Sequence, residues 1–122
     1  MKTLLSLILT LFLPLAASLS AAELQGPETG DAAPAFRLQD QNSKWHQLSD
    51  FKDGYLVLYF YPKDFTGGCT TQVCAFRDDI AALKKAGAKV VGVSLDDVKL
   101  ATELAETSHV PFQLLSDTNT VT

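Results

Sequence analysis

Apolar and polar positions change their period several times along the chain, and these changes predict its secondary structure. Short alternating segments at residues 35–38 and 45–48 predict two strands. Residues 39–44 between them are rich in Asp, Asn and Ser, which is typical of a turn. Residues 49–54 then predict a single helical turn that ends at Gly54. The region before the large apolar run is therefore expected to form two short strands with a turn between them and a single helical turn after them.

The strongest strand signal is the continuous apolar run over residues 55–61, which Pro62 ends. It consists of aromatic, Leu and β-branched residues, which are typical of a central strand covered on both faces. Residues 89–93 predict a further buried strand, and residues 112–115 follow Pro111 as the next candidate. We expect these three segments to form the inner part of one sheet.

Two segments have the period of an amphipathic helix. Over residues 69–85 the apolar side chains recur at intervals of three and four, and Gly87 follows as a C-terminal cap. Asp96 or Asp97 caps a second helix that ends near Thr107. Strands that alternate with helices predict an α/β domain with a largely parallel inner sheet. Because the chain stops soon after the last predicted strand, we expect one face of the sheet to be partly uncovered.

The N-terminal segment resembles an export signal. Lys2 supplies a positive charge, residues 4–17 form an apolar run, and Ser20-Ala21-Ala22 supplies small residues for cleavage after Ala22. The alternative is a membrane anchor, but this run of about 14 residues is shorter than the roughly 20 that span a bilayer. We therefore expect a signal peptide over residues 1–22, a single domain over residues 23–122, and a periplasmic or secreted protein that leaves the membrane after cleavage.

Composition narrows the classes of function. The 122 residues suffice for one domain, and with 47% hydrophobic and 20% charged residues they predict a folded globular protein. The formal net charge is −4, and no run of basic residues occurs. Since binding to a phosphate backbone needs clustered Lys and Arg, we expect no nucleic-acid partner.

The candidate chemistry lies in the loop and first helical turn after residues 55–61. Reaction sites in open α/β sheets gather at the carboxyl ends of strands, and this is such an end. Cys69 falls at the predicted helix N-terminus, where free N–H groups and the helix dipole favour a thiolate, the nucleophilic form of cysteine. Cys69 is therefore the candidate nucleophile.

Neighbouring residues suit this interpretation. Thr66 stands three residues before Cys69, so that its hydroxyl is expected to reach the sulfur or a bound oxygen. Gly67 and Gly68 would allow the backbone to approach the reacting atom closely. Pro62 lacks an N–H group and is expected to shield the sulfur from water.

Read together, these positions resemble a known family. The spacing of Pro62, Thr66 and Cys69 matches the active-site motif of peroxiredoxins. The longer run of residues 59–64, together with residues 69–71 and 74–78, is similar to the Q subfamily, also called bacterioferritin comigratory protein. Residues 30–36, 92–94 and 114–117 also match landmarks of that family, so that the resemblance covers about residues 29–118.

The resemblance implies a thioredoxin-like fold, in which helices flank a central mixed sheet in three layers, and a thiol-dependent peroxidase. Cys69 would reduce hydrogen peroxide and organic hydroperoxides, and Cys74 would resolve the product as a disulfide that a thioredoxin-like protein reduces. Thr66 and Pro62 would shape the peroxide pocket. This chemistry requires no metal, haem or flavin, and we expect a monomer.

The sequence departs from that family at three places, one of which is the helix after Asp97, which lacks the His and Phe that often occur there. Gly67 stands where the family usually has Pro. Family members also continue beyond this C-terminus with an arginine that supports the thiolate, two strands and a helix. Arg77 matches a different family position and is a poor substitute. The resemblance therefore implies a C-terminally truncated, incomplete domain.

The spacing of the two cysteines bears on the alternative functions. Positions five apart on an ideal helix have Cα atoms about 8.6 Å apart, beyond the ~7 Å limit for a disulfide, which disfavours a static bridge between Cys69 and Cys74. A thioredoxin-type oxidoreductase would have two residues between its cysteines. A copper-delivery protein with this fold would have three residues between them and a usable His. This chain has four residues between Cys69 and Cys74. A non-catalytic binding module is the remaining alternative. We expect His46 and His109 at the surface and Trp45 in the core.

Overall fold

The structure is a computed structural model that describes residues 26–120. The predicted signal peptide lies outside the described residues, as does the side chain of Cys69. Five strands and two α-helices follow one another in the order that the sequence predicts, with boundaries shifted by one or a few residues. The elements are β1 (Arg37–Gln39), β2 (Trp45–Gln47), the 3-10 helix η1 (Leu48–Phe51), β3 (Tyr55–Phe60), α1 (Gly67–Lys85), β4 (Ala88–Ser94), α2 (Val98–Thr107) and β5 (Gln113–Ser116).

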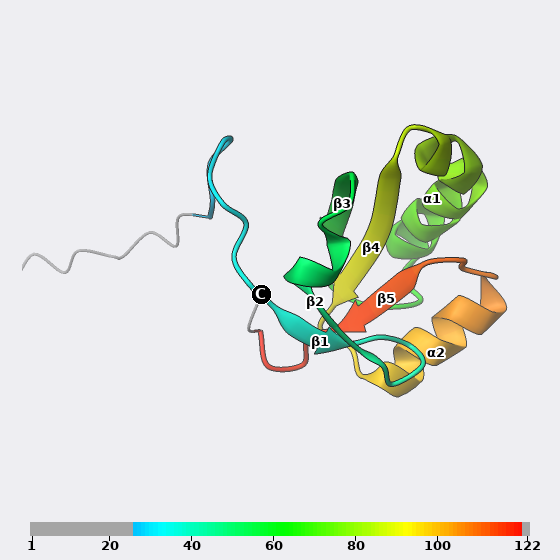
Figure 1. Ribbon diagram of the computed structural model, residues 1–122. Coiled ribbons are helices and arrows are strands. Elements are labelled where there is room, and N and C mark those ends of the chain that lie inside the picture. The colour runs from blue at the N-terminus through cyan, green and yellow to red at the C-terminus, as the bar shows by residue number, and fades with distance from the viewer. Residues whose placement is uncertain (1–25, 121–122) are drawn as a thin grey trace, which may run out of the picture.

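The strands form one mixed sheet in the order β2-β1-β5-β4-β3 (Figure 1). Strands β3, β4 and β5 are parallel, whereas β1 runs antiparallel to both β5 and β2. Among the described residues β3 forms an edge of the sheet and pairs with β4 alone, whereas the run over residues 55–61 predicts a central strand. The most buried strand is β4, which pairs on both sides. An apolar run predicts that the side chains of a strand are covered, but it does not predict which strands pair with that strand.

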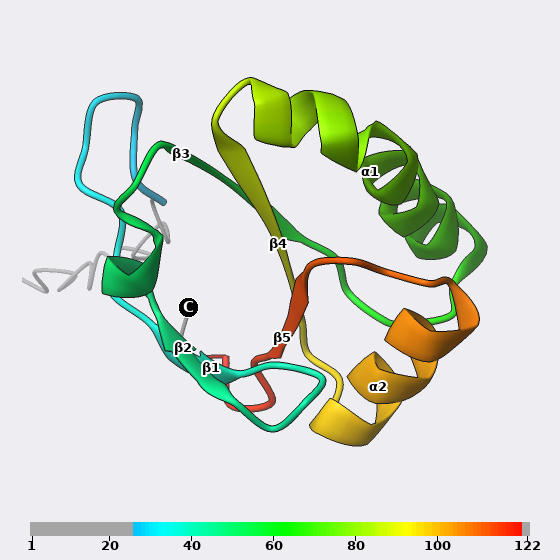
Figure 2. The ribbon, with the colours of Figure 1, turned by 45° about the vertical axis from the view of Figure 1, so that its right-hand side comes forward.

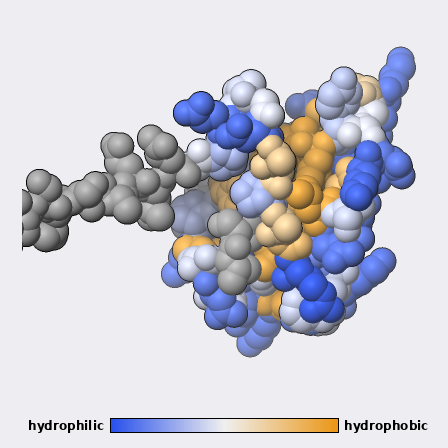
Figure 3. Space-filling model, turned by 60° about the vertical axis from the view of Figure 1, so that its left-hand side comes forward, coloured by the Kyte–Doolittle hydropathy of each residue, from blue (hydrophilic) through white to orange (hydrophobic). Residues whose placement is uncertain are grey.

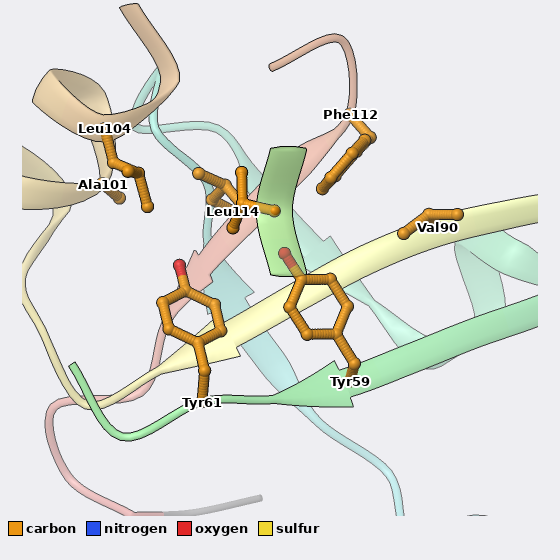
Figure 4. Packing of buried hydrophobic residues seen from close by; sticks show 8 residues of the cluster. Tyr59, Tyr61, Val90, Ala101, Leu104, Phe112 and Leu114 are labelled. Atoms are coloured by element: carbon orange, nitrogen blue, oxygen red, sulfur yellow. The ribbon is translucent and has the colours of Figure 1, made fainter. Parts of the chain in front are cut away.

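Both α-helices pack on the same face of the sheet (Figure 2). Tyr59 links β3 to α1, because its ring lies 4.7 Å from that of Phe76. Opposite Tyr59 in the register stands Gly92, where a Cβ atom would lie 2.7 Å from the Tyr59 hydroxyl oxygen. The missing side chain thus gives the ring its place above β4. Figure 4 shows this core, whose buried members are Tyr59, Tyr61, Val73, Val90, Ala101, Leu104, Phe112 and Leu114.

The opposite face of the sheet has a second, smaller core. Its side chains come from β1, β4, β5 and η1, and among the described residues no α-helix lies on this face. Figure 3 shows apolar side chains exposed between polar margins on the side of the molecule that carries these elements. The buried members of this core are Phe36, Leu38, Phe51, Val91, Val93 and Leu115.

Three aromatic residues that the pattern places in the core are exposed. Trp45 on the edge strand β2 is 49% exposed, and the Arg37 guanidinium lies 4.3 Å from the centre of its ring. Tyr55 at the start of β3 is 75% exposed, and Phe60 at its end is 59% exposed. All three residues stand on strands that, within residues 26–120, have a neighbouring strand on one side only. No helix within residues 26–120 has the length and apolar character to cross a bilayer.

Candidate active site

The loop that leaves β3 leads directly into α1. Tyr61 still donates its N–H to the Val93 carbonyl at 3.0 Å, so the loop departs from the carboxyl ends of β3 and β4. Thr66 is the N-cap residue, and α1 begins at Gly67. The backbone of Cys69 consequently lies in the first turn of α1, as the sequence predicts. At this position the N–H groups of the first turn lack partners within the helix and favour a negative charge.

Thr66 uses its side chain within its own loop. The hydroxyl donates to the Lys63 carbonyl at 3.2 Å and makes no capping bond to the helix. The Thr66 carbonyl accepts the N–H of Thr70 at 2.9 Å, which starts the helical ladder. In this state Thr66 therefore fixes the entry to α1, while the contact with a sulfur or a bound oxygen stays a prediction.

Pro62 borders a cleft of about 330 Å³ at the carboxyl ends of β3 and β4. Thr66 does not line this cleft, so the structure brings Pro62 and Thr66 to neighbouring places but not into one described pocket. The cleft is lined mainly by apolar side chains, which suits a partly apolar occupant. Its lining residues are Phe60, Tyr61, Pro62, Val93, Ser94, Leu95, Asp117 and Thr120.

Cys74 lies one and a half turns after Cys69 on the same uninterrupted helix. It is a free, half-buried cysteine. Because α1 is continuous from Gly67 to Lys85, the Cα separation of about 8.6 Å that an ideal helix predicts applies to this state. Between the two cysteines Val73 is fully buried in the core under α1. A bridge between Cys69 and Cys74 thus requires the helix to unwind close to a core residue.

The predicted close approach of the backbone at Gly67 and Gly68 to the reacting atom stays a prediction, and the backbone conformation of the loop does not require a glycine at either position. A Cβ atom at Gly67 or Gly68 would meet no protein atom within 4 Å, and neither residue has a positive φ. The left-handed position in this loop is instead Phe65, with φ of 59°. Sequence inspection missed this residue, because aromatic side chains rarely adopt such a conformation.

Asp64 is the second residue that sequence inspection missed. Its side chain is buried, and neither carboxylate oxygen has a hydrogen bond of normal geometry within the described structure. Burial raises the pKa of the Asp64 carboxyl, and the negative charges of Asp96 and Asp97 raise it further, while the nearby Tyr61 hydroxyl lowers it. Burial and the proximity of Asp64 also raise the pKa of Tyr61. A charged residue in a loop is normally expected to be exposed to solvent. Only the fold therefore shows that Asp64 is buried.

A third feature is the buried pair of Asp40 and His46. His46, which the sequence places at the surface, is only 7% exposed, and its Nε2 lies 2.7 Å from Oδ2 of Asp40. The other oxygen of Asp40 accepts the N–H groups of Asn42 at 2.8 Å and Lys44 at 3.0 Å. Burial alone would raise the pKa of Asp40, but these hydrogen bonds together hold it below its usual value. The pair closes the turn between β1 and β2, far along the sheet from α1.

Arg77 joins the two helices. Its Nη1 donates to the Ser108 carbonyl at the end of α2 at 2.8 Å, and its Nε donates to Asp78 at 2.9 Å. These bonds hold the guanidinium on the third turn of α1. Arg77 is thereby engaged as a structural link between α1 and α2.

A family model described as the AhpC/TSA family matches residues 29–122. The chain belongs to this family. Among curated proteins, it is 52% identical over 88 residues to the chloroplastic peroxiredoxin Q of Populus jackii and 51% identical over 88 residues to that of Arabidopsis thaliana. Each alignment covers 72% of this chain and 41% of the relative. The resemblance to the Q subfamily that the motif predicts is confirmed.

Solved structures confirm the fold class. The crystal structure of peroxidoxin BcpB from Mycobacterium tuberculosis matches with a TM-score of 0.75 and 38% identity, over 77% of this chain and 62% of that one. The bacterioferritin comigratory protein of Xanthomonas campestris matches with a TM-score of 0.69 and 35% identity, over 70% of this chain and 55% of that one. The chain thus has the thioredoxin-like fold of peroxiredoxins and spans about 41% of the length of the curated relatives that it matches.

Proposed function

We propose that this chain carries the reactive centre of a thiol-dependent peroxidase of the peroxiredoxin Q type. The observation that supports the proposal best is the backbone position of Cys69 in the first turn of α1, three residues after the N-cap Thr66. Free N–H groups there stabilise a thiolate. Relatives named peroxiredoxin Q that are 51–52% identical to this chain support the same chemistry.

In the first step, the Cys69 thiolate attacks the terminal oxygen of a hydroperoxide. An S–O bond forms and the O–O bond breaks, and the departing alkoxide or hydroxide takes up a proton. Cys69 is thereby oxidised to a sulfenic acid while the peroxide is reduced to an alcohol or water. Pro62 is proposed to border the site and Thr66 to orient the peroxide.

In the second step, Cys74 attacks the sulfenic sulfur of Cys69. The S–S bond forms, the S–O bond breaks, and hydroxide leaves and is protonated to water. A dithiol protein of thioredoxin type is the proposed reductant that returns both cysteines to thiols. Hydrogen peroxide and organic hydroperoxides are the proposed substrates, in an exported, monomeric protein.

The two steps favour different backbones. The thiolate needs the N-terminus of α1 intact, whereas a disulfide needs the Cα separation of about 8.6 Å to fall below about 7 Å. We therefore propose that α1 is helical in the reduced form and locally unwound in the oxidised form. Thr70 and Thr71 are weak helix formers in its first turns, which lowers the cost of unwinding.

Substitution of each cysteine tests the proposal. With hydrogen peroxide and a trap for sulfenic acid, Cys69→Ser should show neither adduct nor turnover. Cys74→Ser should give one adduct per chain and no intramolecular disulfide, as measured by mass spectrometry. A thioredoxin-type oxidoreductase would instead reduce disulfides without consuming peroxide. Retained turnover in Cys69→Ser would overturn the assignment.

A further inference from the structure

Phe65 holds an unfavourable backbone conformation at the entrance to α1. Its φ of 59° is left-handed, although it has a bulky side chain that is 47% exposed. Such a conformation persists only where the surroundings enforce it. The exposed ring makes no ring contact within the described structure that would enforce it, so the cause must lie in the residues on either side.

Both neighbours of Phe65 are fixed. On one side, Asp64 is only 4% exposed. The backbone N–H of Asp64 donates to Oδ2 of Asp96 at 2.5 Å. Asp96 is itself held by a bond from its N–H to the Ser94 hydroxyl at 3.3 Å. On the other side, the Thr66 carbonyl accepts the N–H of Thr70 at 2.9 Å. Phe65 is therefore clamped between the end of β4 and the start of α1.

We propose that Asp96 is a positioning residue for the first turn of α1: its carboxylate accepts the backbone N–H of Asp64, holds Phe65 left-handed and so places Thr66 at the N-cap. Asp96 acts through the backbone of Asp64 and touches no reacting atom in this proposal. The inference deepens the proposed function, and it rests on the assignment of Cys69 as the nucleophile only for its effect on catalysis.

The burial of Asp64 predicts which protonation state of its carboxyl group is compatible with the folded turn. The charged groups that face it are Asp96 and Asp97 from the segment between β4 and α2, and the ionisable Tyr61 hydroxyl from the end of β3. None of these supplies a positive charge, and burial raises the pKa of Asp64. The buried site therefore favours the neutral form of the Asp64 carboxyl. Because the folded-state pKa is raised, the turn is weakened as pH rises from the usual value of 3.8 through the raised value.

A clamped, strained turn affects the two chemical steps in opposite directions. Peroxide oxidation uses the intact turn, whereas disulfide formation uses the open one. Loosening the anchor should slow the first step without slowing the second. Relieving the strain at Phe65 should stabilise the closed turn and slow the second step.

The first test compares Phe65→Asn with Phe65→Ala in the reduced chain. Both remove the ring, but only Asn tolerates left-handed backbone well. Amide hydrogen exchange over residues 66–70 should be about fivefold slower in Phe65→Asn than in Phe65→Ala, and disulfide formation should slow by a similar factor. Equal exchange in the two variants would overturn the proposal.

The second test compares Asp96→Ala with Asp96→Asn. Asp96→Ala removes the acceptor of the Asp64 N–H and should speed exchange over residues 66–70 and slow sulfenic acid formation, each about tenfold. Asp96→Asn keeps a side-chain oxygen that accepts this N–H and should keep exchange within about threefold of the parent. In Asp64→Asn the protection of residues 66–70, taken relative to the intrinsic rate at each pH, should no longer fall as pH rises. Exchange within twofold of the parent in Asp96→Ala, or equally fast exchange in both Asp96 variants, would refute the anchor. Amide exchange is measured without peroxide. It therefore tests the contact between Asp64 and Asp96 even if Cys69→Ser retains turnover and the proposed function fails.

Discussion

Val73 should control how readily the two cysteines meet. It is fully buried among residues of β3, β4 and α2, and it lies between Cys69 and Cys74 on α1. Phe76 and Ile80, further along the helix, are only partly buried. Val73, rather than these later residues, is therefore the point at which unwinding from the N-terminus of α1 meets the core.

The magnitude follows from the side chain that Val73→Ala removes. Two buried methyl groups contribute about 0.8 kcal/mol each, and the cavity adds about 1 kcal/mol, which gives about 2–3 kcal/mol. If Val73 leaves the core when the segment opens, the open population rises about 30- to 150-fold. Amide exchange over residues 70–73 and the rate of disulfide formation after peroxide oxidation should rise by up to this factor.

Val90→Ala is the matched control. Val90 is 2% exposed in the same core but lies on β4, outside α1. Both variants should lower the free energy of unfolding by about 2–3 kcal/mol in chemical denaturation. Only Val73→Ala should accelerate local exchange and disulfide formation. Equal effects of the two variants on these local measurements would show that opening stops before Val73 and would refute the reasoning.

Three further predictions concern other parts of the chain. Asp40→Ala removes the acceptor of three hydrogen bonds and should cost about 3 kcal/mol at neutral pH. Because the pKa of Asp40 is lowered, this contribution is complete above 3.8 and is lost as pH falls through the folded-state value, so the denaturation curves of the parent and the variant should converge in acid. Arg77→Met should lower the denaturation midpoint through loss of the link to Ser108, and the exposed Lys85→Met should lower it less. Native protein should begin near Glu23 in mass spectra, and an intact Met1 on cytosolic material would contradict the export prediction.

Local sequence patterns predicted the helices and strands because their causes are local. The period of apolar positions defined α1, and its observed start at Gly67 differs from the expected one by two residues. Asp97 caps α2 through a bond from the Leu100 N–H at 3.0 Å, as its residue type and position indicate. The motif of Pro62, Thr66 and Cys69 follows a predicted strand, and in the structure these residues lie between the end of β3 and the first turn of α1.

The errors concern residues whose surroundings come from distant parts of the chain. Asp64 and His46 are polar residues that the sequence alone would place in solvent, yet the fold buries both. Tyr55 and Trp45 are aromatic, yet both stand on edge strands and are exposed. Burial depends on which segments lie across the sheet, and a residue's own type does not encode that.

The sequence by itself thus determined the order of the elements, the family motif and the position of both cysteines on one helix, since each of these depends on residues a few positions apart. Only the tertiary structure decided that β3 lies at an edge of the described sheet, that Val73 ties the segment between the cysteines to the core, and that Asp64 is buried in the loop before α1. These features arise where β3, β4 and the two helices meet. Their contacts are set by packing across the sheet, which no local period in the sequence records.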